Sequence, residues 1–220
     1  MLTPEQLETM LVLQSTMNAR VDENWLESRY PYLRAVVVEA SEAIEHHGWK
    51  WWKKQHKDVE QLQMELIDIW HFLLSEILLR NDGQLAPAKA YCVDQLTGPG
   101  ITVAIEFDGA QYQPDELDLL AMLELLTGVS TARRIELGLF SSIMQACGLS
   151  WAELYRQYVG KNVLNMFRQD YGYKEGTYLK EWHGREDNEY LVDILARLDD
   201  SAPTFRDEVY QGLKDAYPAD

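Results

Sequence analysis

The chain has 220 residues, with 20 basic side chains against 36 acidic ones and a formal net charge of −16. This acidity argues against binding of a nucleic-acid backbone, although a small nucleotide needs only a local basic pocket or a metal ion. The two cysteines, Cys92 and Cys147, have no metal-binding spacing, which favours a reducing cytoplasm. MLTPEQLETM lacks the features of a secretory signal, and no apolar run is long enough to cross a bilayer. We therefore expect a cytoplasmic protein without a membrane partner.

Helical periodicity dominates the chain and predicts an all-α helical bundle. The first helix begins at Thr3-Pro4, and Gln14 and Asn18 interrupt its apolar face one turn apart. Buried amides need hydrogen-bond partners, and a ligand can supply them. Two further helices are expected over 33–47 and 59–80, and the second is apolar nearly all round, as a central buried helix is.

The remainder of the chain is less regular. Residues 84–113 are predicted to form a long connection or lid, in which 101–107 suggests a strand without an obvious partner. Three helices should follow, over 114–128, 131–147 and 150–159. We expect a single domain with four parts: core helices in 1–83, the irregular connection and helices in 84–159, a mobile lid in 160–198 that ends in a short helix over 187–198, and a loose acidic tail in 199–220.

Two pairs of carboxylates at one-turn spacing are the most informative feature. Glu39 and Glu42 lie in RAVVVEASEAIEHH, and Glu65 and Asp68 lie in LQMELIDIWHFLLSEILL. Residues three apart share one helical face, and carboxylates in an apolar stripe are costly unless they are neutralised. A divalent cation between the two helices would neutralise them, and oxygen ligands favour Mg²⁺, with Mn²⁺ as a substitute.

Other interpretations of these carboxylates carry less weight. Most single pairs of this kind merely face solvent. Glu42 and Glu45 make an alternative pair, but Glu45 adjoins two histidines near the exposed end of its helix. A di-iron bundle needs Glu-x-x-His on two helices, and only Asp68 with His71 approaches that spacing.

A second group of polar residues follows residue 160. Lys161, Asn165 and Arg168 recur on one helical face, and two glycines then flank Lys174, with Lys180 beyond. Such donors can surround a triphosphate from several sides. A solvated helix with a polar loop is the simpler explanation, but a Gly-Tyr-Lys segment after a basic face is typical of a closing lid. The Trp- and Lys-rich string WKWWKK offers a ring that could stack on a base.

Three sequence blocks resemble the dimeric, all-α dUTPase family, which belongs to the all-α NTP pyrophosphohydrolase superfamily with MazG. They are LVLQSTMN, then VVEASEAIEHHGWKWWK with ELIDIWHFLLS, and finally KNVLNMFRQDYGYKEGTYLKEWHGREDNEYL. The resemblance implies a homodimer that hydrolyses dUTP, and also dUDP, by direct attack of a metal-bound water. The products from dUTP would be dUMP and pyrophosphate.

The resemblance also implies roles for individual residues. The metal ligands would be Glu39, Glu42, Glu65 and Asp68, and Glu39 would orient and deprotonate the attacking water. The uracil and deoxyribose would contact Gln14, Asn18 and Trp52, with His71 as a neighbour. The phosphates would be bound by Lys161, Asn165, Arg168, Lys174 and Lys180. Glu186, Asp187 and Asn188 close the last block without separable roles.

Two alternatives stay open at this point. A broader dCTPase/dUTPase or a MazG-like house-cleaning pyrophosphohydrolase would use the same acidic residues, and Gln14 with Asn18 separates these activities only weakly. The other alternative is a non-catalytic helical binding or regulatory protein. The intact acidic quartet argues against it, because a scaffold gains nothing from carboxylates in an apolar helix.

Overall fold

Helices form most of the chain, which confirms the all-α prediction. The computed structural model describes residues 2–97, 104–200, 202 and 204–218. The α-helices are α1 Pro4–Val21, α2 Trp25–Ser28, α3 Tyr32–His47, α4 Val59–Arg80, α5 Leu85–Thr97, α6 Leu119–Thr131, α7 Leu137–Ala146, α8 Trp151–Asp170, α9 Asp187–Leu195 and α10 Phe205–Ala216, with a 3₁₀ turn η1 at Pro114–Glu116. In the described parts of the chain, no helix combines the length and apolar character needed to cross a membrane.

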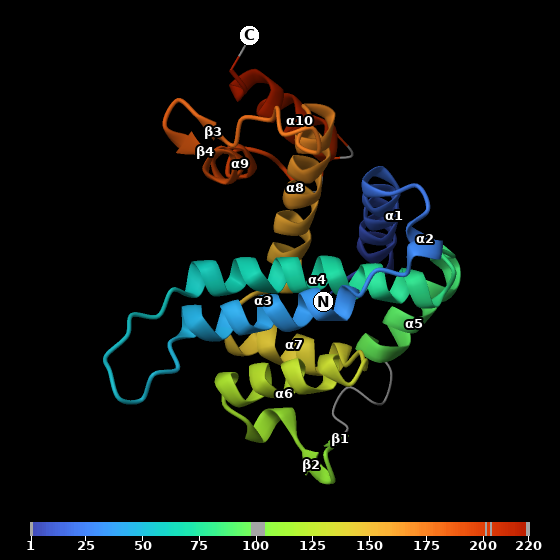
Figure 1. Cartoon of the computed structure of the whole chain (residues 1–220), viewed down its shortest axis with the longest axis vertical. Helices are drawn as coiled ribbons and strands as arrows, with labels where there is room; N and C mark the ends of the chain where they lie inside the picture. Colours follow the sequence, from blue (N-terminus) through green and yellow to red (C-terminus); the bar gives the residue numbers. More distant parts are fainter. Residues whose placement is uncertain (1, 98–103, 201, 203, 219–220) are drawn as a thin grey trace.

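The helix α4 is the centre of the molecule. It lies beside α3 as an antiparallel pair, with α6 and α7 on one side of the pair and α1 and α8 on the other (Figure 1). Leu66, Trp70 and Leu74 are fully buried along α4, and the Trp70 ring stacks on Phe140 of α7 with centroids 5.3 Å apart. The pairing of α3 with α4 is what brings their carboxylates together.

The helix α8 projects from this core and carries the C-terminal elements at its far end (Figure 1). It is continuous through Gly160, where the sequence suggested an end. A Cβ at residue 160 would lie 2.7 Å from Leu195 Cδ1 of α9. Gly160 therefore allows two helices to approach closely and does not end α8.

The prediction of an irregular connection over 84–113 is wrong in its first half, where α5 buries Ala88 and Cys92. The predicted strand has a partner after all: β1 Ile105–Phe107 pairs antiparallel with β2 Ala110–Tyr112. Asp108 and Gly109 between them both have positive φ, 49° and 74°, as a two-residue type I′ hairpin requires. Residues 98–103, which include the start of the predicted strand, lie outside the described residues.

The prediction of a loose tail is also wrong, because α10 packs on α8 and α9. Phe205, Val209 and Leu213 recur every four residues and are buried, so this stripe, and not the acidic surface around it, determines the structure of the tail. A second short hairpin, β3 Glu181–Trp182 with β4 Arg185–Glu186, precedes α9.

Candidate active site

An acidic cluster lies between α3 and α4. One carboxylate oxygen each of Glu39, Glu42 and Glu65 lies within 4.8 Å of the other two. Burial, and after it the neighbouring negative charges, raises the pKa of Glu39 and of Glu65 to about 7. Three converging hard oxygen donors with unfavourable mutual repulsion fit a divalent cation such as Mg²⁺ or Mn²⁺.

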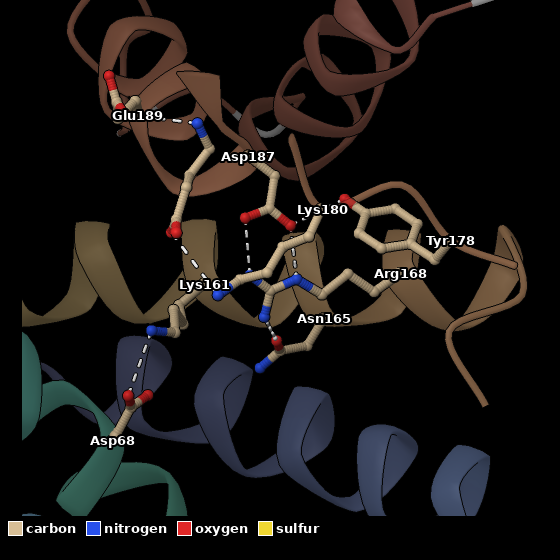
Figure 2. Close-up of polar contacts among 9 residues, drawn as sticks. Asp68, Lys161, Asn165, Arg168, Tyr178, Lys180, Asp187 and Glu189 are labelled. Atoms are coloured by element: carbon tan, nitrogen blue, oxygen red, sulfur yellow. Dashed lines mark hydrogen bonds and ion pairs between the residues drawn. The ribbon is translucent and has the colours of Figure 1, made fainter. Parts of the chain in front are cut away.

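Asp68 belongs to the same electrostatic cluster but has a partner of its own. Its negative charge is among the causes that raise the pKa of Glu39 and Glu65. Its Oδ2 atom lies 3.2 Å from Lys161 Nζ on α8, and the two side chains face each other across the helices (Figure 2). Lys161, which was predicted to bind phosphate, and Asp68, which was predicted to bind the metal, are thus adjacent.

His46 contacts the acidic cluster and was not singled out from the sequence. Its Nε2 atom lies 3.3 Å from Glu65 Oε1. The signal was its position on the same face as Glu42, four residues earlier. Glu45, the alternative partner of Glu42, is exposed and accepts a hydrogen bond from Trp49 Nε1 at 2.6 Å.

A cavity of about 290 Å³ adjoins this cluster, with Asp68 in its wall. Its other lining side chains are both polar and apolar: Gln14, Met17, Asn18, Val21, Tyr30, Tyr32, His71, Phe72, Ser75 and Asn165. The cavity is of the size at which small-ligand pockets begin, and it combines apolar walls with a few convergent polar groups. Gln14, Asn18 and His71, which the sequence assigned to one subsite, all line it.

The amide of Gln14 is the centre of a buried polar network in this cavity. Its Nε2 donates to Asn18 Oδ1 at 3.0 Å and to Ser75 Oγ at 2.8 Å. Its Oε1 accepts from the Tyr158 hydroxyl at 2.8 Å and lies 2.9 Å from His71 Nδ1. Two buried atoms of the network, Asn18 Nδ2 and His71 Nε2, have no hydrogen-bond partner among the described residues. Such atoms are available to a ligand.

His71 is neutral in this environment. Burial, with the nearby charge of Lys161 as a smaller cause, lowers its pKa to about 3. The ring stacks on Tyr158 with centroids 4.1 Å apart. A neutral imidazole carries one N–H, so one of its nitrogens donates and the other accepts.

Ser75 and Tyr158 are members of this network that the sequence analysis did not identify. Ser75 follows His71 by one helical turn within an otherwise apolar stretch of α4, and that spacing was the available signal. Tyr158 precedes Lys161 by three residues on α8, but a tyrosine at that position is equally typical of a core residue.

The structure does not bring Trp52 to the cavity. Its side chain lies in the connection between α3 and α4, where it is 57% exposed, and it contacts Trp49 and Trp51 edge to face. This connection extends from the end of the α3–α4 pair away from α1 (Figure 1). Within one chain, Trp52 is therefore separate from Gln14 and Asn18.

Arg168 and Asn165 form a second polar network above the cavity. Arg168 makes two hydrogen bonds to Asp187, at 2.8 and 2.9 Å, and Tyr178 donates to the same carboxylate at 2.9 Å. Arg168 Nη1 also donates to Asn165 Oδ1 at 3.2 Å (Figure 2). Because Asp187 is fully buried, this contact connects α9 firmly to α8 and orients the Asn165 amide.

The two lysines of the predicted lid are exposed. Lys174 Nζ lies 3.5 Å from the carbonyl oxygen of Val21, and Lys180 Nζ lies 3.6 Å from Glu186 Oε2. Neither lysine lines the cavity. Their contacts are long and solvent-exposed, so little free energy opposes their movement.

In a comparison with protein families, a family model described as dUTPase matches residues 6–173. The matched region contains the acidic cluster, the Gln14 network and Arg168, and it ends before Lys174 and Lys180. No curated protein matches the chain.

Proposed function

The chain belongs to the all-α dUTPase family, and from this premise we propose that it hydrolyses dUTP to dUMP and pyrophosphate, using Mg²⁺ at the acidic cluster. Membership makes the protein a hydrolase, a dUTP diphosphatase. We also propose dUDP as a substrate, with phosphate as the second product. The proposal is supported mainly by the position of Asp68. This residue lines the cavity, and its negative charge also contributes to the raised pKa of Glu39 and Glu65.

From this geometry we assign the orientation of the bound substrate. The uracil and deoxyribose occupy the cavity, where Asn18 Nδ2 and His71 Nε2 are free to bind the base. The phosphates extend past Asp68 toward Lys161. Lys161 then exchanges its contact with Asp68 for phosphate oxygens, since a triphosphate is the stronger partner for an ammonium group.

Hydrolysis needs charge neutralisation on the phosphates and an oriented water. Mg²⁺ held by Glu39, Glu42, Glu65 and Asp68 would supply the neutralisation. Glu39 orients the water and accepts its proton as the water oxygen attacks phosphorus and the bond to the leaving pyrophosphate breaks. Glu39 must be ionised to accept the proton, and a cation bound beside it would favour the ionised carboxylate in spite of its burial.

Lys174 and Lys180 are assigned to the phosphates after closure of the segment that follows α8. Support comes from their exposure and from the weak contacts that they make in this structure. Arg168 is assigned a positioning role, since Asp187 occupies two of its donors. It orients Asn165, which lines the cavity.

The test is product release from dUTP, dCTP, dTTP and UTP, with and without Mg²⁺, together with phosphate release from dUDP. Metal-dependent release that is fastest with dUTP and dUDP is the expected result. Comparable rates with several nucleoside triphosphates would instead indicate the broader house-cleaning activity. Absence of hydrolysis with every nucleotide would contradict the proposal.

A further inference from the structure

The Gln14 amide is held at each end by a hydroxyl group that has a second acceptor within reach. The Tyr158 hydroxyl lies 2.8 Å from Gln14 Oε1 and 3.0 Å from the carbonyl oxygen of Met10. The Ser75 hydroxyl lies 3.1 Å from Asn18 Oδ1 and 3.0 Å from the carbonyl oxygen of His71. Each hydroxyl has one proton, so it donates to only one of its two acceptors at a time.

Because each hydroxyl can change its acceptor, the hydrogen-bond donors and acceptors of the whole network can be exchanged. If the Gln14 and Asn18 amides both turn by half a rotation, Gln14 Nε2 faces His71 Nδ1 and the Tyr158 oxygen. Tyr158 then donates to Met10, Ser75 donates to Gln14, and Asn18 Nδ2 donates to Gln14 and Ser75. Every distance is one that the structure already contains. Apart from the one group that is left for a ligand, Asn18 Nδ2 in the first arrangement or His71 Nε2–H in the inverted one, every buried donor of the network has a partner in both.

We propose that Tyr158 is a specificity-determining positioning residue: its hydroxyl, by turning from Gln14 to Met10, allows the amides to invert so that the cavity binds cytosine nucleotides as well as uracil nucleotides. The inference deepens the proposed function, on which it rests for the identity of the cavity as the base site. Tyr158 is fully buried and does not line the cavity, so it acts through Gln14.

The two arrangements present opposite groups to a base. In the first, Asn18 Nδ2 donates and His71 Nε2 accepts, which complements the O4 and N3–H edge of uracil. In the inverted one, Asn18 Oδ1 accepts and His71 Nε2–H donates, which complements the amino group and N3 of cytosine in the same ring position. Because His71 is neutral, its single proton must move between the two nitrogens when the amides turn.

Removing the Tyr158 hydroxyl affects the two arrangements unequally. In the uracil arrangement, Gln14 Oε1 still accepts from His71. In the cytosine arrangement, one N–H of Gln14 loses its acceptor and stays buried. A buried N–H group without an acceptor costs free energy. Tyr158→Phe should therefore raise the preference for uracil over cytosine by roughly tenfold. The stacking of the ring on His71 is kept, since phenylalanine retains it.

Ser75→Ala is the internal comparison, because Ser75 accepts one N–H in each arrangement, from Gln14 or from Asn18. It should weaken binding of both pyrimidines to a similar extent. Tyr155→Phe makes the same chemical change one turn earlier on α8, outside the network, and should leave both affinities unchanged.

The experiment is calorimetric titration of dUMP and dCMP into the wild type and these three variants, which needs no turnover. Measurable dCMP binding by the wild type, and a dCMP/dUMP ratio of dissociation constants that rises only in Tyr158→Phe, is the expected result. No dCMP binding by the wild type, or an unchanged ratio in Tyr158→Phe, overturns the inference. Failure of the proposed function would appear separately, as absent dUTP hydrolysis.

The His71 ring gives a second, spectroscopic readout. Nitrogen NMR of histidine-labelled protein, assigned with a His71→Gln variant, distinguishes protonation at Nδ1 from protonation at Nε2. We expect the Nδ1–H form with dUMP and the Nε2–H form with dCMP. The same tautomer with both nucleotides would also overturn the inference, and a purely structural role of Tyr158 would not produce the change.

Discussion

Glu39 illustrates how a residue's environment prepares it for a role. In a peptide its carboxyl would be ionised at neutral pH, but burial and the charges of Asp68, Glu65 and Glu42 raise its pKa to about 7. Val36 and Ala43, one turn before and after it on α3, are buried and apolar, so part of the surroundings of the carboxyl group is apolar. A bound cation would lower the pKa of Glu39 again and favour the ionised carboxylate.

The substitution Glu39→Gln should lower turnover of dUTP by at least roughly 100-fold, because general-base contributions are typically of this size or larger. Binding of a non-hydrolysable dUTP analogue should remain, since the nucleoside cavity is unchanged. Steady-state kinetics and calorimetry measure the two quantities. Glu45→Gln, on the same helix but in contact with Trp49 and Lys50, is the matched control. Turnover near that of the wild type would remove Glu39 from the base role.

At the scale of elements, the arrangement depends on close contacts between the middle and the far end of α8. The Arg168–Asp187 pair and the approach of α9 at Gly160 connect the helices. The aromatic rings of Phe167, Tyr178 and Tyr217 pack together there, and the Tyr217 hydroxyl accepts a hydrogen bond from the backbone of Leu179. The segment that carries Lys174 and Lys180 is thus anchored at both ends while its lysines remain in solvent.

Gly160→Ala should destabilise the protein, because the new Cβ would lie 2.7 Å from a methyl group of Leu195. Overpacking of this kind costs about 1–3 kcal/mol, measured as the free energy of unfolding in urea. The double variant Gly160→Ala/Leu195→Ala makes room for the methyl group and should show less than the sum of the two single losses. Additive losses would mean that Leu195 is not what opposes the new methyl group, and a gain in stability for Gly160→Ala would mean that the higher helix propensity of alanine outweighs the crowding.

Lys174→Ala should weaken binding of a non-hydrolysable dUTP analogue more than binding of dUMP, because the lysine is assigned to the outer phosphates. Paired calorimetric titrations at one ionic strength give the comparison. Lys214→Ala removes a similarly exposed charge from α10 and should affect both ligands little. Equal losses of analogue and dUMP binding in Lys174→Ala would contradict the lid assignment.

At the scale of the whole molecule, the metal-free acidic cluster makes stability depend on pH. The folded-state pKa values of Glu39 and Glu65, about 7, exceed the ordinary value of 4.5. The folded state therefore binds more protons between pH 4.5 and pH 7. Its stability decreases as the pH rises through that window.

Metal-free protein should accordingly gain more stability between pH 8 and pH 6 than the variant Glu39→Gln/Glu65→Gln. The stabilisation by Mg²⁺ should be larger at pH 8 than at pH 6, because protons compete with the cation. Thermal unfolding with a chelator or with Mg²⁺ at the two pH values measures both effects. A Mg²⁺ effect that is equal at both pH values would exclude this cluster as the metal site.

The exposed Trp51 and Trp52 rings are the other feature at this scale. They are 87% and 57% exposed, and large apolar side chains in solvent commonly mark a surface that a partner covers. We expect a homodimer by sedimentation analysis, and a weaker one for Trp51→Ala/Trp52→Ala. A monomeric wild type at micromolar concentration would contradict the dimer that the resemblance implies.

The amino-acid sequence by itself determined the helical class, the family and the carboxylates of the acidic cluster. These depend on local periodicity: apolar spacing defines α3 and α4, and one-turn spacing places Glu39 with Glu42 and Glu65 with Asp68. The buried stripe of α10 and the Asp108-Gly109 turn were also readable from local patterns, although the tail was predicted to be loose and the strand unpaired.

Only the tertiary structure decided which separate helices meet. The Lys161–Asp68 pair joins residues 93 positions apart, and the Tyr158–Gln14 contact joins residues 144 apart. No local pattern encodes such contacts, because they follow from how α1, α4 and α8 pack. The same packing left Trp52 away from the cavity and Arg168 bound to Asp187. Side-chain partners across helices are determined by the whole core, whereas each helix is determined largely by its own residues.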